Sequence, residues 1–117
     1  MKKILIIEDD VDTLEVMELI FRDSGYAIIK ANRLVPIKEI ISITPNLAIL
    51  DIMLPYGFGS DICLEIKNDP KSKHIPVILY SASSDLKKLA KASHADAYLE
   101  KPFDLNMLLE MVEETIL

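Results

Sequence analysis

The sequence has little cysteine and little histidine, and each shortage excludes a class of site. Cys63 is the only cysteine in 117 residues, so no intramolecular disulfide can form, and we expect a reducing, cytoplasmic location. We expect Cys63 to pack on the inner face of a helix, without a redox role. The two histidines, His74 and His94, are too isolated to suggest a metal-binding pair, and we expect both in loops.

Long apolar runs and a surplus of basic residues are also missing. No apolar run approaches transmembrane length, and the run at residues 4–7 is too short for the core of a signal peptide. The chain has 13 basic and 19 acidic residues, a net charge of −6, whereas nucleic-acid binders normally carry a basic surplus. Lysines cluster only at Lys87, Lys88 and Lys91, which is typical of a solvated helix face. We therefore expect neither membrane association nor direct nucleic-acid binding.

What the sequence does contain is a regular alternation of apolar runs and segments of helical periodicity. The expected strands cover residues 3–7, 26–30, 47–51, 76–80 and 97–99. The expected helices run from residue 11 to a C-cap at Gly25, over 35–43, from a cap at Ser60 or Asp61 to 67, over 83–93 and over 105–116, with a loop at 54–59. Alternating strands and helices predict one α/β domain over residues 1–117, with a doubly wound, five-stranded parallel sheet in three layers.

Polar residues stand at the predicted carboxyl ends of the strands, where open parallel sheets bind their ligands. They are Glu8-Asp9, Asp51, Ser81 and Glu100-Lys101; Asp10, which opens the first helix, is expected to be its N-cap. If Glu8, Asp9 and Asp51 lie within about 4 Å, each pair repels by roughly 4 kcal/mol at an effective dielectric near 20. Such a cluster needs solvent, protons or a cation. Carboxylates without histidine or cysteine select Mg²⁺ or Mn²⁺, and Mg²⁺ commonly binds a substrate phosphate as well.

Four segments of the chain, in order, resemble the response-regulator receiver domains of two-component signalling. They are residues 4–9 (Ile-Leu-Ile-Ile-Glu-Asp), 50–55 (Leu-Asp-Ile-Met-Leu-Pro) with Gly59 four residues on, 75–82 (Ile-Pro-Val-Ile-Leu-Tyr-Ser-Ala) and 95–103 (Ala-Asp-Ala-Tyr-Leu-Glu-Lys-Pro-Phe). Each segment alone would be weak evidence for the family. Together, at the right strand ends, they are highly specific, and the resemblance covers the whole chain.

The resemblance implies a flavodoxin-like fold and a role for each matching residue. Asp51 would be the phosphoacceptor, and Ser81 and Lys101 would each contact a phosphoryl oxygen. Asp9 and Asp51 would hold Mg²⁺ together with Glu8 and the main-chain carbonyl of Met53. Tyr98 would be an aromatic switch, and the Lys101–Pro102 peptide would be cis. A histidine kinase or a histidine phosphotransfer protein would supply the phosphoryl group, and a downstream protein would be the target.

The chain departs from the family pattern at four places. Glu8 replaces the commoner Asp, and Ser81 replaces the commoner Thr while keeping a hydroxyl. The segment between Ser81 and Lys101 is about two residues short, so we expect a curtailed fourth helix. His94 stands where the family usually has glycine. We expect the output surface on the fifth strand and fifth helix, around Tyr98, Leu105 and Leu108.

Other functions with a similar fold are less well supported. A haloacid-dehalogenase-type phosphatase needs a second Asp two residues after the nucleophile, where this chain has Met53, and needs room for a cap domain. A flavodoxin-like FMN binder would want a Ser/Thr/Gly-rich loop after the first strand, where this chain has acids. The alternative kept open is a pseudo-receiver, a protein-binding module that is not phosphorylated, although its usual signature is loss of residues that are present here. The chain is expected to be either a single-domain regulator or a fragment of a longer protein, and Met1 directly before the first strand favours a native amino terminus.

Overall fold

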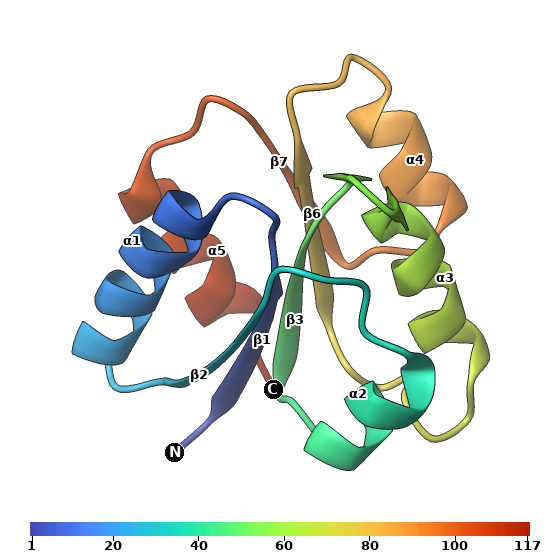
Figure 1. Cartoon of the computed structure of the whole chain (residues 1–117), viewed down its shortest axis with the longest axis horizontal. Helices are drawn as coiled ribbons and strands as arrows, with labels where there is room; N and C mark the ends of the chain where they lie inside the picture. Colours follow the sequence, from blue (N-terminus) through green and yellow to red (C-terminus); the bar gives the residue numbers. More distant parts are fainter.

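A computed structural model describes all residues from 1 to 117 and shows three layers, with a sheet between two groups of helices (Figure 1). The sheet is parallel and has five strands in the spatial order β2 (Ala27–Ala31), β1 (Lys3–Ile7), β3 (Leu47–Asp51), β6 (Val77–Ser81) and β7 (Ala97–Glu100). The doubly wound α/β fold predicted from the alternating segments is confirmed.

Helices cover both faces of this sheet. Helices α1 (Val11–Asp23) and α5 (Leu105–Thr115) lie on one face, and α2 (Ile37–Ile43), α3 (Gly59–Asn68) and α4 (Leu86–Ala92) lie on the other (Figure 1). Strand side chains alternate between the two faces, so Ile4 and Ile6 enter the core beneath α1 and α5, while Leu5 and Ile7 enter the opposite core. Strands β3 and β6 are buried along their whole length, because both of their faces are covered.

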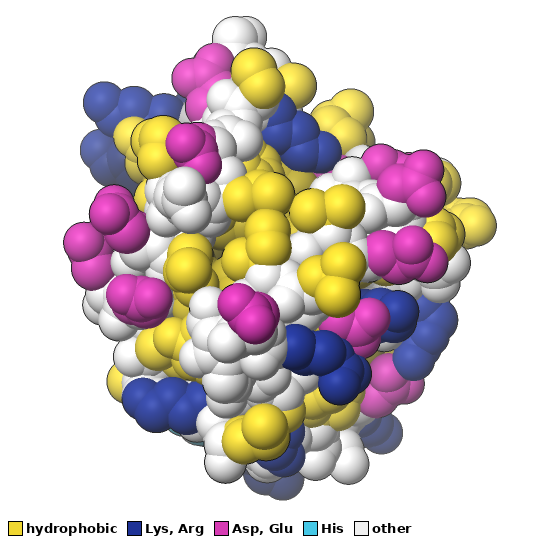
Figure 2. Space-filling model, turned by 90° about the vertical axis from the view of Figure 1, so that its left-hand side faces the viewer, with side chains coloured by type: hydrophobic (Ala, Val, Ile, Leu, Met, Phe, Trp, Pro, Cys, Tyr) yellow, Lys and Arg dark blue, Asp and Glu magenta, His cyan; other side chains and the backbone are white.

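The face formed by α1 and α5 carries apolar side chains over its middle and charged side chains around them (Figure 2). The exposed large hydrophobic residues of these two helices are Val11, Val16, Leu19 and Met107. Leu108 is only 1% exposed, so the expectation that it belongs to an output surface is wrong. It packs in the core with Val112, which lies one helical turn further on the same side of α5.

The segment expected to be a loop after β3 contains a small ribbon. Its antiparallel strands are β4 (Met53–Leu54) and β5 (Gly57–Phe58). Helix α3 then begins at Gly59 with Phe58 in the N-cap position, so neither Ser60 nor Asp61 is the cap. The Gly59 N–H donates to the carbonyl of Ile52 at 2.9 Å, and this bond sets the start of the helix directly against the end of β3.

Two helix starts agree only in part with the sequence-based expectations. Asp10 occupies the N-cap position of α1, but its side chain bonds to no helix N–H and accepts from the Thr13 hydroxyl at 2.6 Å. Helix α4 begins only at Leu86, which confirms the expected short fourth helix. The C-cap of α1 is Ser24, one residue before the expected Gly25, which follows it with φ +93°. His94 has φ +63° after α4, a left-handed conformation that explains the usual glycine at this position.

Other expected features are present. Cys63 is buried in α3, and its thiol donates to the Ser93 carbonyl at 3.4 Å, in agreement with a packing role. His74 and His94 lie in turns, and the Lys101–Pro102 peptide is cis. None of the helices has the length and apolar character needed to span a membrane. The cytoplasmic location stays a prediction.

Gly59 marks a close approach between α3 and the end of β3. A Cβ atom at this position would lie 2.1 Å from the carbonyl oxygen of Asp51 and 2.9 Å from its carbonyl carbon. Both atoms belong to the backbone, so no flexible side chain can move aside. The missing side chain at position 59 therefore permits the packing that fixes the backbone of Asp51.

We expect Gly59→Ala to lower the free energy of unfolding by about 1–3 kcal/mol, because overpacking a tight contact forces the backbone to shift. Urea unfolding followed by circular dichroism measures this loss. Gly25→Ala is the comparison, since no atom lies within 4 Å of a Cβ there and only the positive φ resists the substitution. A Gly59→Ala protein as stable as wild type would contradict the close approach.

Candidate functional site

The carboxyl ends of β1, β3, β6 and β7 meet at one edge of the sheet, and their side-chain alternation decides which residues meet there. Ile6, Ile49 and Ile78 all face the core beneath α1 and α5. Two residues further along the same strands are Glu8, Asp51 and Tyr80, which a period of two directs to the same side. Ser81 has the opposite parity and belongs to the side covered by α3 and α4.

Three carboxylates converge at this edge, as predicted. Oxygen atoms of Glu8, Asp9 and Asp51 all lie within 4.8 Å of one another. Glu8 is 1% exposed and Asp51 is 4% exposed, while Asp9 is open to solvent. Carboxylates at this separation repel each other by a few kcal/mol per pair, roughly, even at an effective dielectric near 20. The fold therefore holds a concentrated negative charge that a cation would relieve.

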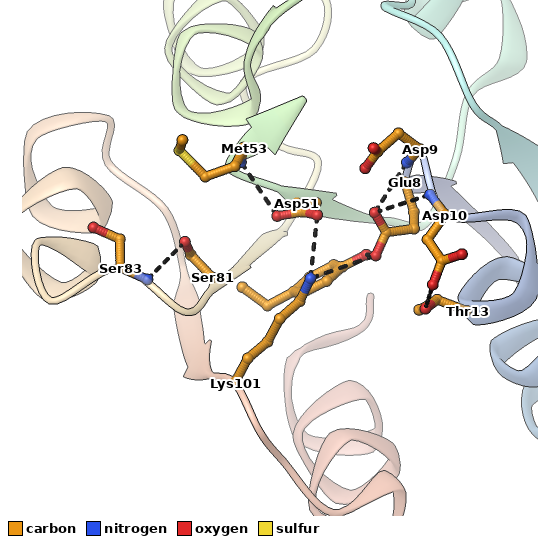
Figure 3. Close-up of polar contacts among 10 residues, drawn as sticks. Glu8, Asp9, Asp10, Thr13, Asp51, Met53, Ser81, Ser83 and Lys101 are labelled. Carbon is orange, nitrogen blue, oxygen red and sulfur yellow. Dashed lines mark hydrogen bonds and ion pairs between the residues drawn. The ribbon is translucent and has the colours of Figure 1, made fainter. Parts of the chain in front are cut away.

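Lys101 is the basic residue of the site. Its Nζ lies 3.2 Å from Oδ2 of Asp51 and 3.6 Å from Oε1 of Glu8, and its side chain is one-third exposed (Figure 3). Three carboxylates and one ammonium leave the cluster with a formal charge of −2. Lysine alone does not neutralise the site, and the oxygen-only ligand set that remains fits a hard cation such as Mg²⁺.

Tyr80 contributes to this site, although from the sequence it was expected only as a residue of a strand. Its hydroxyl donates to Oε1 of Glu8 at 2.9 Å, and Nζ of Lys101 lies 4.8 Å from the centre of its ring. Oε2 of Glu8 accepts from the main-chain N–H of Asp9 at 2.9 Å. The sequence contained a signal for this role, because Tyr80 directly precedes Ser81 and has the same strand parity as Glu8 and Asp51. The sequence did not show that the Tyr80 hydroxyl extends across the sheet as far as Glu8.

Burial and charge shift the pKa values of these groups. Desolvation raises the pKa of Glu8, and its contact with the Asp51 carboxylate raises it further. The pKa of Asp9 is raised chiefly by its side-chain contact with Glu8. Burial, together with the negative charge of Glu8 and Asp51, raises the pKa of Tyr80, so its hydroxyl keeps the proton that it donates.

Ser81 and Met53 flank Asp51 on its other side. The main-chain N–H of Met53 donates to Oδ1 of Asp51 at 3.2 Å, and the buried Ser81 hydroxyl accepts from the N–H of Ser83 at 3.1 Å (Figure 3). A cavity of about 430 Å³ lies between these residues and is lined by Asp51, Met53, Ser81, Ala82, Ser83 and Lys101. Of the predicted site residues, Asp51, Met53, Ser81 and Lys101 line this cavity, while Glu8 and Asp9 lie beside Asp51 in the carboxylate cluster.

Tyr98 lies apart from the carboxylates. It is 41% exposed on β7 and borders a second cavity of about 470 Å³, next to Lys87 and Lys91 of α4. Its ring is therefore already in an outward position, at the groove between α4 and β7.

Comparisons with known proteins agree with this geometry. Residues 4–113 match the family model of the response regulator receiver domain. The chain is 30% identical over 115 residues to the DNA-binding dual master transcriptional regulator RpaA of Synechocystis sp., covering 96% of this chain and 48% of that protein. It is 34% identical over 115 residues to the response regulator ArlR of Staphylococcus saprophyticus, covering 96% of this chain and 51% of that protein.

Among solved structures, the response regulator TrrA of Thermotoga maritima in complex with Mg²⁺–BeF superposes with a TM-score of 0.85 at 31% identity, covering 97% of this chain and 98% of that chain. The chain spans about half the length of the two curated relatives.

The raised pKa of Glu8 predicts how stability depends on pH in the absence of divalent cations. Unfolded, the carboxyl returns to its ordinary pKa of 4.5, so between that value and the raised folded value the folded state binds more protons. Stability must then decrease as pH rises through this window. We expect the free energy of unfolding to fall as the pH rises above 4.5, measured by urea titration in EDTA.

The control for this experiment is Glu8→Gln, which cannot titrate. Its stability at any single pH is not informative, because glutamine changes the hydrogen bonds to Tyr80 and Asp9. The slope with pH is the readout. Equal slopes in wild type and variant would show that Glu8 does not carry the effect.

Proposed function

The chain belongs to the response regulator receiver domain family, and from that premise we propose that it accepts a phosphoryl group on Asp51 with the help of bound Mg²⁺. The whole of residues 1–117 would act as one receiver domain in two-component signalling. The observation that carries the proposal is the position of Asp51, which is 4% exposed at the end of β3 with Lys101 on one oxygen and two further carboxylates beside it.

The proposed donor is the phosphohistidine of a histidine kinase or of a histidine phosphotransfer protein. An oxygen of Asp51 forms the new bond to phosphorus, and the bond between phosphorus and the imidazole nitrogen breaks, with its electron pair remaining on the imidazole. A carboxylate is a competent nucleophile for this transfer. Lys101 and Ser81 border the same cavity as Asp51, and their ammonium and hydroxyl groups would bind the oxygens of the transferred group.

Glu8, Asp9 and Asp51 would hold the metal, with the main-chain carbonyl of Met53 as a further ligand. When bound, Mg²⁺ supplies neutralisation of negative charge on the phosphoryl oxygens and the acids. The fit rests on the oxygen-only donor set within 4.8 Å and on the charge that Lys101 leaves uncompensated. The similar TrrA protein is described with Mg²⁺–BeF, which supports the assignment by analogy. The same donors would accept Mn²⁺.

The chain would act as a switch and not as a turnover enzyme, because the group that it phosphorylates is its own Asp51. The target would be a downstream protein. RpaA is a DNA-binding regulator about twice as long as this chain. Residues 1–117 carry a net charge of −6 and would not bind DNA directly.

A route from the site to the surface supports this switch. The Ser81 hydroxyl accepts from the N–H of Ser83, and the Ser83 hydroxyl in turn accepts from the N–H of Asp85, immediately before α4. If Ser81 turns toward the phosphoryl group, the first of these bonds breaks and the start of α4 is released. Tyr98 borders the groove next to α4. The output surface would include Tyr98 together with two residues of α5, the half-buried Leu105 and the exposed Met107.

We expect one phosphoryl adduct from acetyl phosphate or phosphoramidate, formed only with Mg²⁺ or Mn²⁺, because repulsion from three carboxylates otherwise opposes an anionic donor. Intact mass spectrometry detects the added mass, and Asp51→Asn should abolish it. An Asp51→Asn protein that still gained a full acyl-phosphate adduct would place the acceptor elsewhere. A wild-type protein that gained none would favour the pseudo-receiver alternative.

The second expectation concerns the switch. Adding beryllofluoride, a phosphate mimic, with Mg²⁺ should shift the NMR signals of Ser83, Asp85 and Tyr98 as well as those near Asp51, because the Ser81–Ser83 bond is exchanged for one to the mimic. Asp51→Asn is the control and should show none of these shifts. If changes stayed within the loop after Asp51, the route to α4 would be wrong and the active-site face itself would carry the signal.

A further inference from the structure

We propose that Tyr80 is a positioning residue for the metal site, whose hydroxyl orients the Glu8 carboxylate and competes with Lys101 for its oxygen Oε1. This inference rests on the proposed Mg²⁺ site and adds a residue to it. The hydroxyl donates to Oε1 of Glu8 at 2.9 Å, while the main-chain N–H groups of Asp9 and Asp10 lie at 2.9 and 3.5 Å from Oε2. Both oxygens of the carboxylate are thus fixed by separate donors.

The ring of Tyr80 cannot adjust easily, which makes its hydroxyl a rigid donor. Tyr80 is 0% exposed, and its ring meets that of Phe103 edge-on with 5.7 Å between centroids. The ring also contacts Lys101, whose Nζ lies 4.8 Å from the ring centre, a cation–π distance. One side chain therefore contacts both the acid and the lysine of the site.

Packing alone does not account for a tyrosine here. Phenylalanine would fill the same space without burying a hydroxyl, and buried hydroxyls are unfavourable unless they are hydrogen-bonded. The only hydrogen bond of this hydroxyl is to Glu8, a residue of the carboxylate cluster. The hydroxyl thus binds the Glu8 carboxylate, while the ring packs in the hydrophobic core.

Removing the hydroxyl has a predictable consequence. The nearest remaining side-chain donor for Oε1 of Glu8 is the ammonium of Lys101, now 3.6 Å away. Lys101 already forms an ion pair with Glu8. Without the Tyr80 hydroxyl on Oε1, the ammonium can shorten this ion pair, which takes Glu8 from the metal and Lys101 from Asp51. A cation must then compete with the lysine for Glu8.

The test is Mg²⁺ titration of Tyr80→Phe by isothermal calorimetry, with Tyr26→Phe as the matched control. Tyr26 packs edge-on against Phe21, and its hydroxyl makes no hydrogen bond within the protein. We expect Tyr80→Phe to weaken Mg²⁺ binding by about threefold to tenfold, the net size typical of one hydrogen bond. Tyr26→Phe should bind as wild type does, and urea unfolding should show both variants folded.

Two further readouts separate positioning from a general effect on the fold. In a Glu8→Gln background, Tyr80→Phe should no longer change the Mg²⁺ affinity, because the residue it positions has lost its charge. At saturating Mg²⁺, Tyr80→Phe should form the acetyl-phosphate adduct at close to the wild-type rate, since the metal then reclaims Glu8. A deficit that persisted at saturation, or persisted in the Glu8→Gln background, would contradict the proposal.

The remaining outcomes are also decisive. Unchanged or tighter Mg²⁺ binding in a folded Tyr80→Phe protein, with a wild type that binds Mg²⁺ and is phosphorylated, would overturn the role of Tyr80 alone. A wild type that neither binds Mg²⁺ nor takes up phosphoryl would instead overturn the proposed function.

Discussion

Repulsion among three carboxylates at one edge of the sheet is the constraint around which the rest of the site is arranged. Glu8 and Asp51 are almost fully buried, so water screens them little, and the raised pKa of Glu8 reflects this. The fold tolerates the cluster because Lys101, Tyr80 and several main-chain N–H groups point at its oxygens. These groups do not neutralise the negative charge of the three carboxylates. A divalent cation would neutralise what remains, and together with Lys101 it would also bind the incoming phosphoryl group.

The sheet keeps these charges together because its central strands cannot move independently. Parallel pairing aligns the ends of β1, β3 and β6, and two hydrophobic cores clamp the sheet from both sides. Gly59 adds a third restraint, since it lets α3 begin directly on the backbone of Asp51. In a less tightly packed sheet the three carboxylates would move apart because they repel each other. Here the packing energy of the two cores opposes that movement.

The adjacent residues Tyr80 and Ser81 of β6 point to opposite sides of the sheet and contact different parts of the site. Tyr80 points beneath α1 and α5 and contacts Glu8 and Lys101, whereas Ser81 points toward α3 and α4 and contacts Ser83. Metal binding and signal output would therefore be served by neighbouring residues of opposite parity. This arrangement lets a change at Ser81 reach α4 while Tyr80 and the metal ligands stay in place.

The sequence by itself determined the order of strands and helices, the parallel sheet and the meeting of Glu8, Asp9, Asp51 and Lys101, because solidly apolar runs and the residues that end them are local signals. It also indicated the short α4 and a loop at His94, whereas the left-handed conformation of His94 came from the structure. Only the tertiary structure decided that Tyr80 reaches Glu8 and that Leu108 faces the core, since both depend on the distance between elements far apart in the chain. The same holds for the β4–β5 ribbon and for the start of α3 at Gly59, which a bond to Ile52 fixes. Local preference placed a cap at Ser60 or Asp61, but the close contact with the end of β3 overrode it, because packing against a rigid sheet outweighs the roughly 1 kcal/mol that a cap contributes.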